Sequence, residues 1–347
     1  MASYLLNFQE YIMAFRYEMT AAGADQVQRV EVEDRAVSDR QVKVRIHASS
    51  MNFHDYITLS GLIPRVSYPT VPLSDGCGEI VCCGKSVSTF AVGDRVMPLF
   101  YPHWQQGRPD PDVKRDILGE SMDGCLQEFL YIDADSVVKA PENLSDAEAA
   151  TLGCAGLTAW YSLMEENTLQ AKHTVLLQGT GGVSLAALQI AKAVGARVVI
   201  TSSSDHKLEK AKAMGADYLI NYKTHPNWEE KVNELTGGVN IALDTGGQNT
   251  LGRAVKCTKD DGFIAVIGVL SGFGSASVSI IDVMQKNITI KGVTVGCKES
   301  YDRLCRFVET HDIRPVISHS YKASELAEAV NVMSAGSHFG KISIVVD

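Results

Sequence analysis

The chain has 347 residues, of which 45% are hydrophobic and 21% are charged, and its formal net charge is −9. This composition is typical of a folded protein with two domains and excludes a largely disordered chain. The acidic balance argues against non-specific nucleic-acid binding, which needs a basic surface. No uncharged apolar run reaches the ~18 residues of a membrane helix, and residues 1–17 lack the pattern of a signal peptide. The eight scattered cysteines predict free thiols and a cytoplasmic protein.

The first part of the chain, to about residue 140, has the pattern of a β-rich domain. Residues 41–47 (QVKVRIH) alternate between apolar and polar side chains, as a half-buried strand does. Glycine and proline interrupt the following segments, and the polar stretch 101–124 with its three prolines predicts a long loop. Residues 126–132 predict another strand.

After Pro141 the pattern changes to alternating strands and helices. Ser145 is followed three residues later by Glu148, a capping-box signature that predicts the start of a helix. Short apolar strands then alternate with helices, which predicts a parallel, doubly wound sheet. Expected strands are 174–178, 197–201, 218–220, 240–244 and 262–267, and expected helices are 182–194, 205–214 and 228–235. The tail adds expected strands at 288–295 and 341–346 and expected helices at 301–310 and 323–333.

A glycine-rich loop follows the first strand of this alternating region and opens a helix. Its residues are Gly179, Thr180, Gly181, Gly182, Val183 and Ser184. Glycines in this position permit a tight turn and the close approach of a pyrophosphate, which the helix N-terminus attracts. The loop therefore predicts a dinucleotide site, although an ordinary glycine-rich turn is the alternative.

The end of the second strand indicates which dinucleotide is bound. An NAD site usually has a carboxylate there, about 20 residues after the first glycine. This chain instead has a run of serines that includes Ser202 and Ser203, with Lys207 one turn further on. Hydroxyls and a positive charge suit a 2′-phosphate, so we expect NADP. Asp205 is close enough to leave NAD as an alternative.

The chain resembles the medium-chain dehydrogenase/reductase superfamily, and within it the zinc-free quinone oxidoreductase and enoyl reductase branch. The motifs that carry this resemblance are 92–96 (VGDRV), 151–160 (TLGCAGLTAW), 191–196 (AKAVGA), 212–217 (KAMGAD) and 338–342 (HFGKI). The resemblance implies a GroES-like catalytic domain formed by residues 1–140 and 288–347. It also implies a Rossmann domain, residues 141–287, inserted between these two segments, with the active site in the cleft.

The resemblance also bears on zinc. Catalytic zinc needs three protein ligands and an open fourth position. Where zinc-dependent members have a cysteine and a histidine–glutamate pair, this chain has Asn52 and then Ser74 and Asp75. Only the third ligand position keeps a cysteine, Cys154, and the stretch 101–124 has none of the four cysteines of a structural zinc lobe. The resemblance therefore implies that no zinc is bound.

Further cofactor contacts follow from the resemblance. Quinone oxidoreductases that use NADPH hold its 2′-phosphate with a lysine and a tyrosine, which correspond to Lys207 and Tyr222, with Ser203 beside them. Thr158 corresponds to a residue that faces the nicotinamide. The backbone at Gly268 and Val269 is expected to pass close to the same ring.

Reduction without a metal needs a hydrogen-bond donor for the substrate oxygen and a source of a proton. The candidates lie in one segment: Asn52 as a polar contact, His54 as a proton donor or relay, and Tyr56 as a second donor. A hydrogen-bonded structural pair is the alternative for His54, and we expect Asp55 to be structural. Residues Tyr101, Trp104 and Met122 of the long loop either line the substrate pocket or only pack within the loop.

The function that we expect is zinc-independent reduction of an activated C=C bond in a quinone, enone or enal, with NADPH as cofactor. Interconversion of alcohols and ketones with the same cofactor is an alternative. A non-catalytic, NADPH-binding protein is an alternative of another class. The resemblance further implies a small-molecule substrate and a homodimer, with residues 283–295 near the interface.

Overall fold

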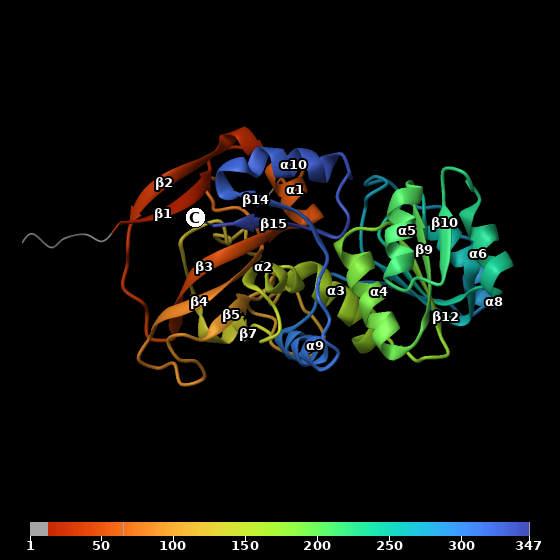
Figure 1. Ribbon diagram of the computed structural model, residues 1–347, viewed down its shortest axis with the longest axis horizontal. Coiled ribbons are helices and arrows are strands. Elements are labelled where there is room, and N and C mark those ends of the chain that lie inside the picture. The colour runs from red at the N-terminus through yellow and green to blue at the C-terminus, as the bar shows by residue number, and fades with distance from the viewer. Residues whose placement is uncertain (1–12, 65, 347) are drawn as a thin grey trace, which may run out of the picture.

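The structure, a computed structural model, describes residues 13–64 and 66–346, and Figure 1 shows that they form two lobes side by side. The expectation of no signal peptide falls largely on residues outside this range. The strands are β1 Met13–Met19, β2 Val27–Glu33, β3 Gln41–Met51, β4 Asp75–Cys83, β5 Arg95–Pro98, β6 Phe129–Asp133, β7 Val137–Lys139, β8 Thr174–Gln178, β9 Arg197–Ser202, β10 Tyr218–Asn221, β11 Val239–Asp244, β12 Thr258–Val266, β13 Thr289–Gly292, β14 Ile317–Lys322 and β15 Lys341–Val345. The helices are α1 Phe53–Leu59, α2 Asp146–Ala149, α3 Leu157–Trp160, α4 Gly182–Val194, α5 Asp205–Ala213, α6 Trp228–Thr236, α7 Leu251–Cys257, α8 Ile280–Gln285, α9 Lys298–Thr310 and α10 Leu326–Ser334.

The first lobe is built on a sheet with the strand order β14-β15-β3-β4-β5-β7, and β6 also pairs with β3. The alternation expected in β3 is confirmed, because Val42, Val44 and Ile46 are buried while Arg45 between them is exposed. β1 and β2 form a separate antiparallel pair beside this sheet. The β-rich fold of this lobe is therefore as the sequence predicts.

The second lobe is a six-stranded sheet with the order β10-β9-β8-β11-β12-β13, in which every neighbouring pair is parallel. The central strand β8 is buried along its whole length. Separate clusters of apolar side chains cover the two faces of the sheet, as a doubly wound fold requires. The carboxyl ends of β8 and its neighbours consequently form one edge, where the glycine loop lies.

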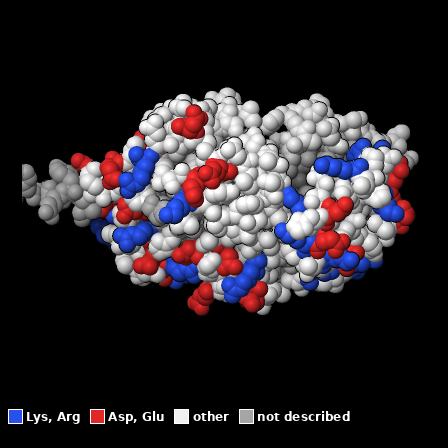
Figure 2. Space-filling model, turned by 45° about the horizontal axis from the view of Figure 1, so that its top comes forward, with Lys and Arg blue, Asp and Glu red and all other residues white. Residues whose placement is uncertain are grey.

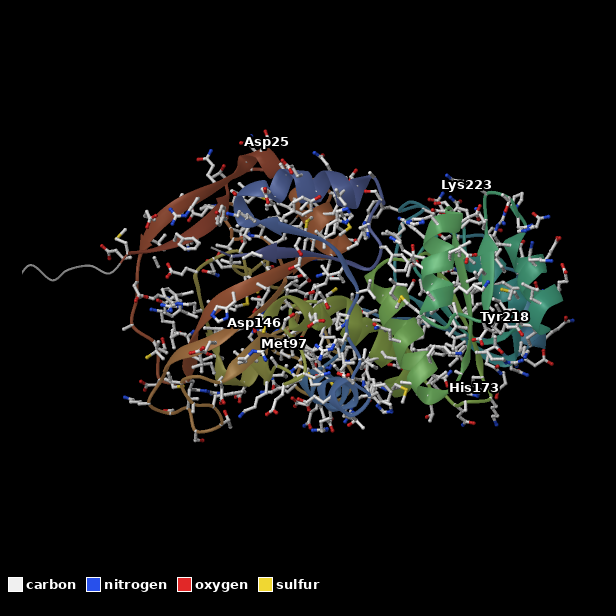
Figure 3. The ribbon with its side chains drawn as sticks, in the orientation of Figure 1. Asp25, Met97, Asp146, His173, Tyr218 and Lys223 are labelled. Atoms are coloured by element: carbon white, nitrogen blue, oxygen red, sulfur yellow. The ribbon has the colours of Figure 1, made fainter. Side chains whose placement is uncertain are left out.

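Helical segments join the two lobes. Ser145 and Glu148 form the expected capping box of α2, and Asp146 of α2 (labelled in Figure 3) binds His47 of β3 and Arg95 of β5. The segment 152–165, called the linking helix below, contains α3 between two π-helical turns and continues toward the second lobe. One apolar cluster extends from β5 of the first lobe through α3 to α4 of the second. A shared apolar core therefore joins the two lobes.

The C-terminal tail returns to the first lobe, where β15 pairs antiparallel with β3. Figure 1 shows β14, β15 and α10 there, in blue beside the red and orange N-terminal strands. The expected boundary at residue 288 is wrong, because β13 pairs with β12 in the second lobe. A strand pattern does not reveal which sheet the strand joins. The chain passes back to the first lobe only after Gly292, the last residue of β13.

Charged side chains of both signs are mixed over the surface. On the face in Figure 2, Lys and Arg alternate with Asp and Glu around a broad area without charges, and no basic stripe crosses that face. Within the described ranges, no helix combines the length and apolar character needed to cross a membrane.

Candidate active site

The glycine loop has the shape of a pyrophosphate cradle. Gly179 has φ +76°, and Gly181 is the N-cap of the 13-residue helix α4 without any side-chain cap. A Cβ added at either glycine would meet no atom within 4 Å, so open space adjoins the loop. The uncapped N–H groups at the start of α4 are therefore available to an anion. These residues fit a dinucleotide.

Two buried polar side chains fix the strand ends beside this loop. Gln178 ends β8, and its amide donates to Asp244 of β11 at 3.2 Å. Asp244 also accepts from the Gly247 N–H at 2.6 Å, and burial raises the pKa of its carboxyl. The Gly268 N–H donates to the Asp244 carbonyl at 3.3 Å, which places Gly268 and the adjacent Val269 at the same edge. Sequence reasoning did not identify Gln178 or Asp244, because a polar residue ending an apolar strand has no specific signature.

The expected ribose-phosphate residues gather at the ends of β9 and β10. The Tyr222 N–H donates to the Ser202 carbonyl at 3.0 Å, and Ser203 follows Ser202 at the start of the turn into α5. The Lys207 ammonium donates to the carbonyls of Gly336 and His338 at 2.6 and 2.8 Å. Burial lowers the pKa of Lys207. Lys207 thus contacts the C-terminal segment of the other lobe, and its role at a 2′-phosphate stays a prediction.

Thr158 lies in α3 within the linking helix and is 3% exposed. Its hydroxyl donates to the Cys154 carbonyl at 2.7 Å. Its only proton is therefore used inside the helix, and toward a cofactor Thr158 offers an oxygen acceptor and its methyl group.

A buried polar cluster surrounds Asn52, the N-cap of α1. The Asn52 amide donates to Asp75 at 2.8 Å and to Ser74 at 3.3 Å. The ammonium of Lys341, the first residue of β15, donates to the Asn52 side-chain oxygen and, at 2.8 Å, to the Met51 carbonyl. The same ammonium lies 3.5 Å from Asp75. Burial raises the pKa of Asp75, while the charge of Lys341 opposes the shift.

Asp55 is a structural residue at this site. Its carboxylate accepts from the Asn52 N–H at 2.7 Å and from the Ser74 N–H at 2.9 Å. Burial by itself raises the pKa of Asp55, but the charge of His54 and these backbone donors outweigh it, so the pKa is lowered. Asp55 thereby fixes the start of α1 and the entry to β4.

His54 lies between two buried carboxylates. Its Nε2 is 2.8 Å from Glu120, its Nδ1 is 3.9 Å from Asp55, and Phe100 packs edge-on against the ring at 5.0 Å. Burial by itself lowers the pKa of His54, but the charges of Asp55 and Glu120 and the hydrogen bond to Glu120 outweigh it and raise the pKa to about 9. At neutral pH His54 is therefore an imidazolium.

Glu120 and Lys341 are two further site residues that sequence reasoning missed. Glu120 follows Gly119, whose φ is +77° and where an added Cβ would lie 2.9 Å from the Leu73 backbone. Only glycine fits this turn, which carries Glu120 to His54. A Gly-Glu pair inside a polar loop does not indicate that the glutamate is buried against a histidine. Lys341 belongs to the motif 338–342 but carries no functional signal by itself.

The other expected residues lie apart from this cluster. The Tyr56 hydroxyl is 3.3 Å from the Ser334 hydroxyl of α10. Tyr101 and Trp104 are 7% and 1% exposed, and their rings pack edge-on against each other, as the packing alternative predicts. Met122 packs against the apolar core of the first lobe. These side chains are thus engaged in packing.

The residues at the zinc positions do not fit a zinc ion. Asn52 and Ser74 offer neutral oxygen or nitrogen atoms, and burial raises the pKa of the Cys154 thiol well above its usual range. The Lys341 ammonium already lies among these residues, so a second cation would meet a positive charge. Nowhere in residues 13–64 and 66–346 do three or more His, Cys, Asp or Glu side chains form a group that could hold a metal.

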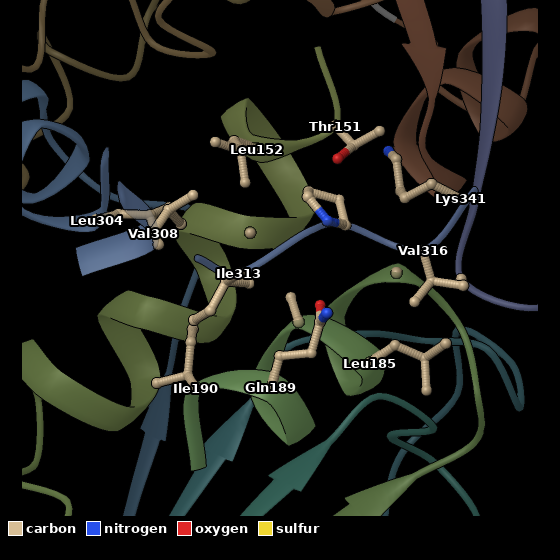
Figure 4. A pocket seen from close by; sticks show the side chains of 15 residues that line it. Thr151, Leu152, Leu185, Gln189, Ile190, Leu304, Val308, Ile313, Val316 and Lys341 are labelled. Atoms are coloured by element: carbon tan, nitrogen blue, oxygen red, sulfur yellow. The ribbon is translucent and has the colours of Figure 1, made fainter. Parts of the chain in front are cut away.

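A small cavity of about 30 Å³ lies beside the linking helix. Figure 4 shows Leu152, Leu185 and Ile313 among the apolar side chains that line it, with Lys341 at one margin. Its volume suits one or two waters and not a cofactor or an organic substrate. The cavity is therefore a packing gap at the junction of the lobes.

Comparisons with known proteins agree with this architecture. Residues 38–142 match a family model described as an alcohol dehydrogenase GroES-like domain, and residues 182–310 match one described as a zinc-binding dehydrogenase. A zinc-type alcohol dehydrogenase-like protein of Schizosaccharomyces pombe is 37% identical, with 96% of this chain and 100% of that protein covered. A quinone oxidoreductase of Pseudomonas aeruginosa is 30% identical, with 93% and 97% covered. A solved structure described as an alcohol dehydrogenase of Sinorhizobium meliloti has a TM-score of 0.90 at 38% identity, with 96% and 98% covered.

The pKa of His54 tests the arrangement of the two carboxylates. We expect its Cε1–H signal to titrate near pH 9 by NMR, and the Glu120→Gln variant to titrate at least about one unit lower, because one charged partner is lost. The folded pKa exceeds the ordinary value of 6.5, so His54 contributes stability that is complete below about pH 6.5 and disappears as pH rises through 9. The signal of the exposed His225 is the control. Titration of His54 below pH 7 in the wild type would contradict the arrangement.

Proposed function

The chain belongs to the medium-chain dehydrogenase/reductase superfamily, and we propose that it is a zinc-independent reductase of activated C=C bonds that prefers NADPH. It is an oxidoreductase that uses a nicotinamide cofactor and acts on small molecules. The Asn52–Asp75–Lys341 cluster is the main support for a reductase that works without zinc. In this cluster a buried ammonium contacts Asn52, which corresponds to a zinc-ligand position in the resemblance, and lies near Asp75.

The chemistry of the site suits this reaction. NADPH, when bound, supplies the hydride. Reduction of a quinone, enone or enal leaves negative charge on the substrate oxygen, which needs a hydrogen-bond donor or a positive group. Lys341 offers a positive group at the start of α1, where the side-chain oxygen of Asn52 holds its ammonium. His54, two residues further along the chain, carries a proton at neutral pH and is the candidate source of the proton.

The similarity to the quinone oxidoreductase of Pseudomonas aeruginosa supports the branch that we propose. Interconversion of alcohols and ketones is the second candidate. The relatives in Schizosaccharomyces pombe and Sinorhizobium meliloti are described as alcohol dehydrogenase-like and as an alcohol dehydrogenase, which favours it. The proposed cytoplasmic location is supported by the eight cysteines, all of which are free thiols in the structure.

Initial rates with a panel of substrates separate these candidates. In the presence of EDTA, we expect NADPH consumption with a quinone and with an α,β-unsaturated ketone and little with a saturated ketone, because no bound metal polarises the carbonyl. Turnover of only the saturated ketone would favour the second candidate. Loss of all activity in EDTA, restored by zinc, would contradict the proposed independence of zinc.

The Lys207→Ala variant tests the preference for NADPH. We expect the KM for NADPH to rise about tenfold, the cost of one lost charge-assisted hydrogen bond to the 2′-phosphate. The KM for NADH should change little, because NADH lacks this phosphate. If Lys207 serves only to join the lobes through Gly336 and His338, both KM values will rise together. Lys212→Ala, an exposed lysine on the same helix, is the matched control.

A homodimer is proposed on the exposed edge of the second lobe. Strand β13 ends the six-stranded sheet, and Ile280, Ile281 and Met284 of the adjacent α8 are 65–69% exposed. An unpaired strand edge next to apolar side chains is a surface that a second copy can extend. Ile290 of β13 is also partly exposed.

Light scattering of the purified protein tests the dimer. We expect a mass of about twice 37.6 kDa for the wild type and 37.6 kDa for Ile281→Glu, because a buried, unpaired carboxylate disfavours the interface. Val92→Glu, which changes an exposed valine on the first lobe, is expected to remain dimeric. A monomeric wild type would contradict the proposal.

A further inference from the structure

The ammonium of Lys341 is a buried charge at the centre of the candidate site. The Lys341 side chain is 6% exposed and that of Asp75 is 1% exposed. A charge removed from water must be matched by an opposite charge and hydrogen bonds. Here Asp75 supplies the charge, and the oxygens of Asn52 and Met51 accept the hydrogen bonds. The group is thus fully built into the fold rather than left at its surface.

The cofactor loop fixes the stem of this lysine. A Cβ added at Gly182 would lie 2.6 Å from Lys341 Cδ, so the aliphatic stem lies directly against the first residue of α4. The preceding Gly340 donates its N–H to the Thr180 carbonyl at 2.9 Å. Lys341 therefore extends from the glycine loop of one lobe to Asn52 of the other. It joins the cofactor cradle to the candidate catalytic amide.

The groups that face this ammonium belong to two of the segments that the resemblance assigns to zinc ligands, and the third segment lies beside Asp75. Asn52 binds it, and Asp75, next to Ser74, lies 3.5 Å away. One oxygen of Asp75 is buried without a hydrogen-bond partner, and it lies beside Gly153, the neighbour of Cys154. The three segments therefore converge on one cationic point.

We propose that the Lys341 ammonium takes the place of a metal cation in this site, where it neutralises Asp75, orients Asn52 and stabilises the negative charge of the reduced substrate. The last role rests on the proposed function, and the first two do not. A fixed positive group costs no reorganisation when charge develops on a substrate oxygen. Lys341 acts as a positioning and electrostatic residue, and the proton that completes the reduction comes from another source.

Zinc binding to redesigned sites tests whether the ammonium occupies the cation position. Asn52→Cys/Ser74→His restores two ligands beside Cys154. We expect zinc to bind one to one in Asn52→Cys/Ser74→His/Lys341→Met, and at least about tenfold more weakly when Lys341 is retained, because two cations repel each other at this range. Isothermal titration with zinc chloride and metal analysis provide the readout. Lys212→Met in the double variant is the control and should not strengthen binding.

Two results would overturn this part of the proposal. The first is equal affinity with and without Lys341, which would mean that the ammonium is not at the cation position. The second is no zinc binding in the triple variant when circular dichroism shows that it is folded, which would mean that the three segments do not converge on one point. Neither result depends on catalytic activity.

Variants of the native site test the role of the charge. We expect Lys341→Met to unfold at a lower denaturant concentration than the wild type, because Asp75 loses its partner. Lys341→Met/Asp75→Asn removes both charges and should recover most of the stability. With NADPH and a quinone, we expect kcat of this double variant to fall at least about 100-fold, the size of effect seen when an oxyanion donor is lost. Lys341→Arg should retain more activity than either variant.

The stability and the kcat of these variants test different parts of the proposal. A stable double variant with the wild-type kcat would overturn the electrostatic role of Lys341. Recovery of neither stability nor folding in the double variant would overturn its pairing with Asp75. If the wild type itself reduces no quinone or enone, the proposed function fails, while the zinc and stability measurements still decide the place of the ammonium.

Discussion

The pairing of the Lys341 ammonium with Asp75 and Asn52 is the constraint on which the site depends. Three segments far apart in the chain, at the starts of α1, β4 and β15, supply these groups. A buried charge without its partners would destabilise the fold, so the three segments must meet. The pairing of β15 with β3, in which Ile342 lies opposite Met51, delivers the lysine to this point. The return of the C-terminal tail to the first lobe is thus also the step that completes the site.

The same contact couples the two lobes. The stem of Lys341 lies against the glycine loop, and Lys207 reaches back from the second lobe to the carbonyls of Gly336 and His338. The segment 336–341 is therefore held at both ends by residues of the cofactor-binding lobe. A cofactor in the cradle would contact a surface to which both lobes contribute, as an active site in a cleft requires.

Local patterns predicted much of the fold correctly. The alternation in β3, the capping box of Ser145 and Glu148, and the βα repeats after residue 174 all appear where expected. Sequence reasoning was wrong about the boundary at residue 288, because a four-residue strand such as β13 has the same pattern in either sheet. It also did not identify Glu120, which the predicted long loop 101–124 carries into the interior.

The sequence by itself determined the doubly wound lobe, the glycine loop that opens α4 and the residue types at Asn52, Ser74 and Cys154. Periodicity, glycine turns and residue identity are local properties, and they can be read without knowing what lies opposite. Only the tertiary structure decided the partners of the charged groups. His54 meets Glu120 across 66 residues, Lys207 meets Gly336 across 129, and Lys341 meets Asn52 across 289. A buried charge is matched by whichever opposite group the folded chain brings within hydrogen-bond distance, and no local pattern encodes that choice.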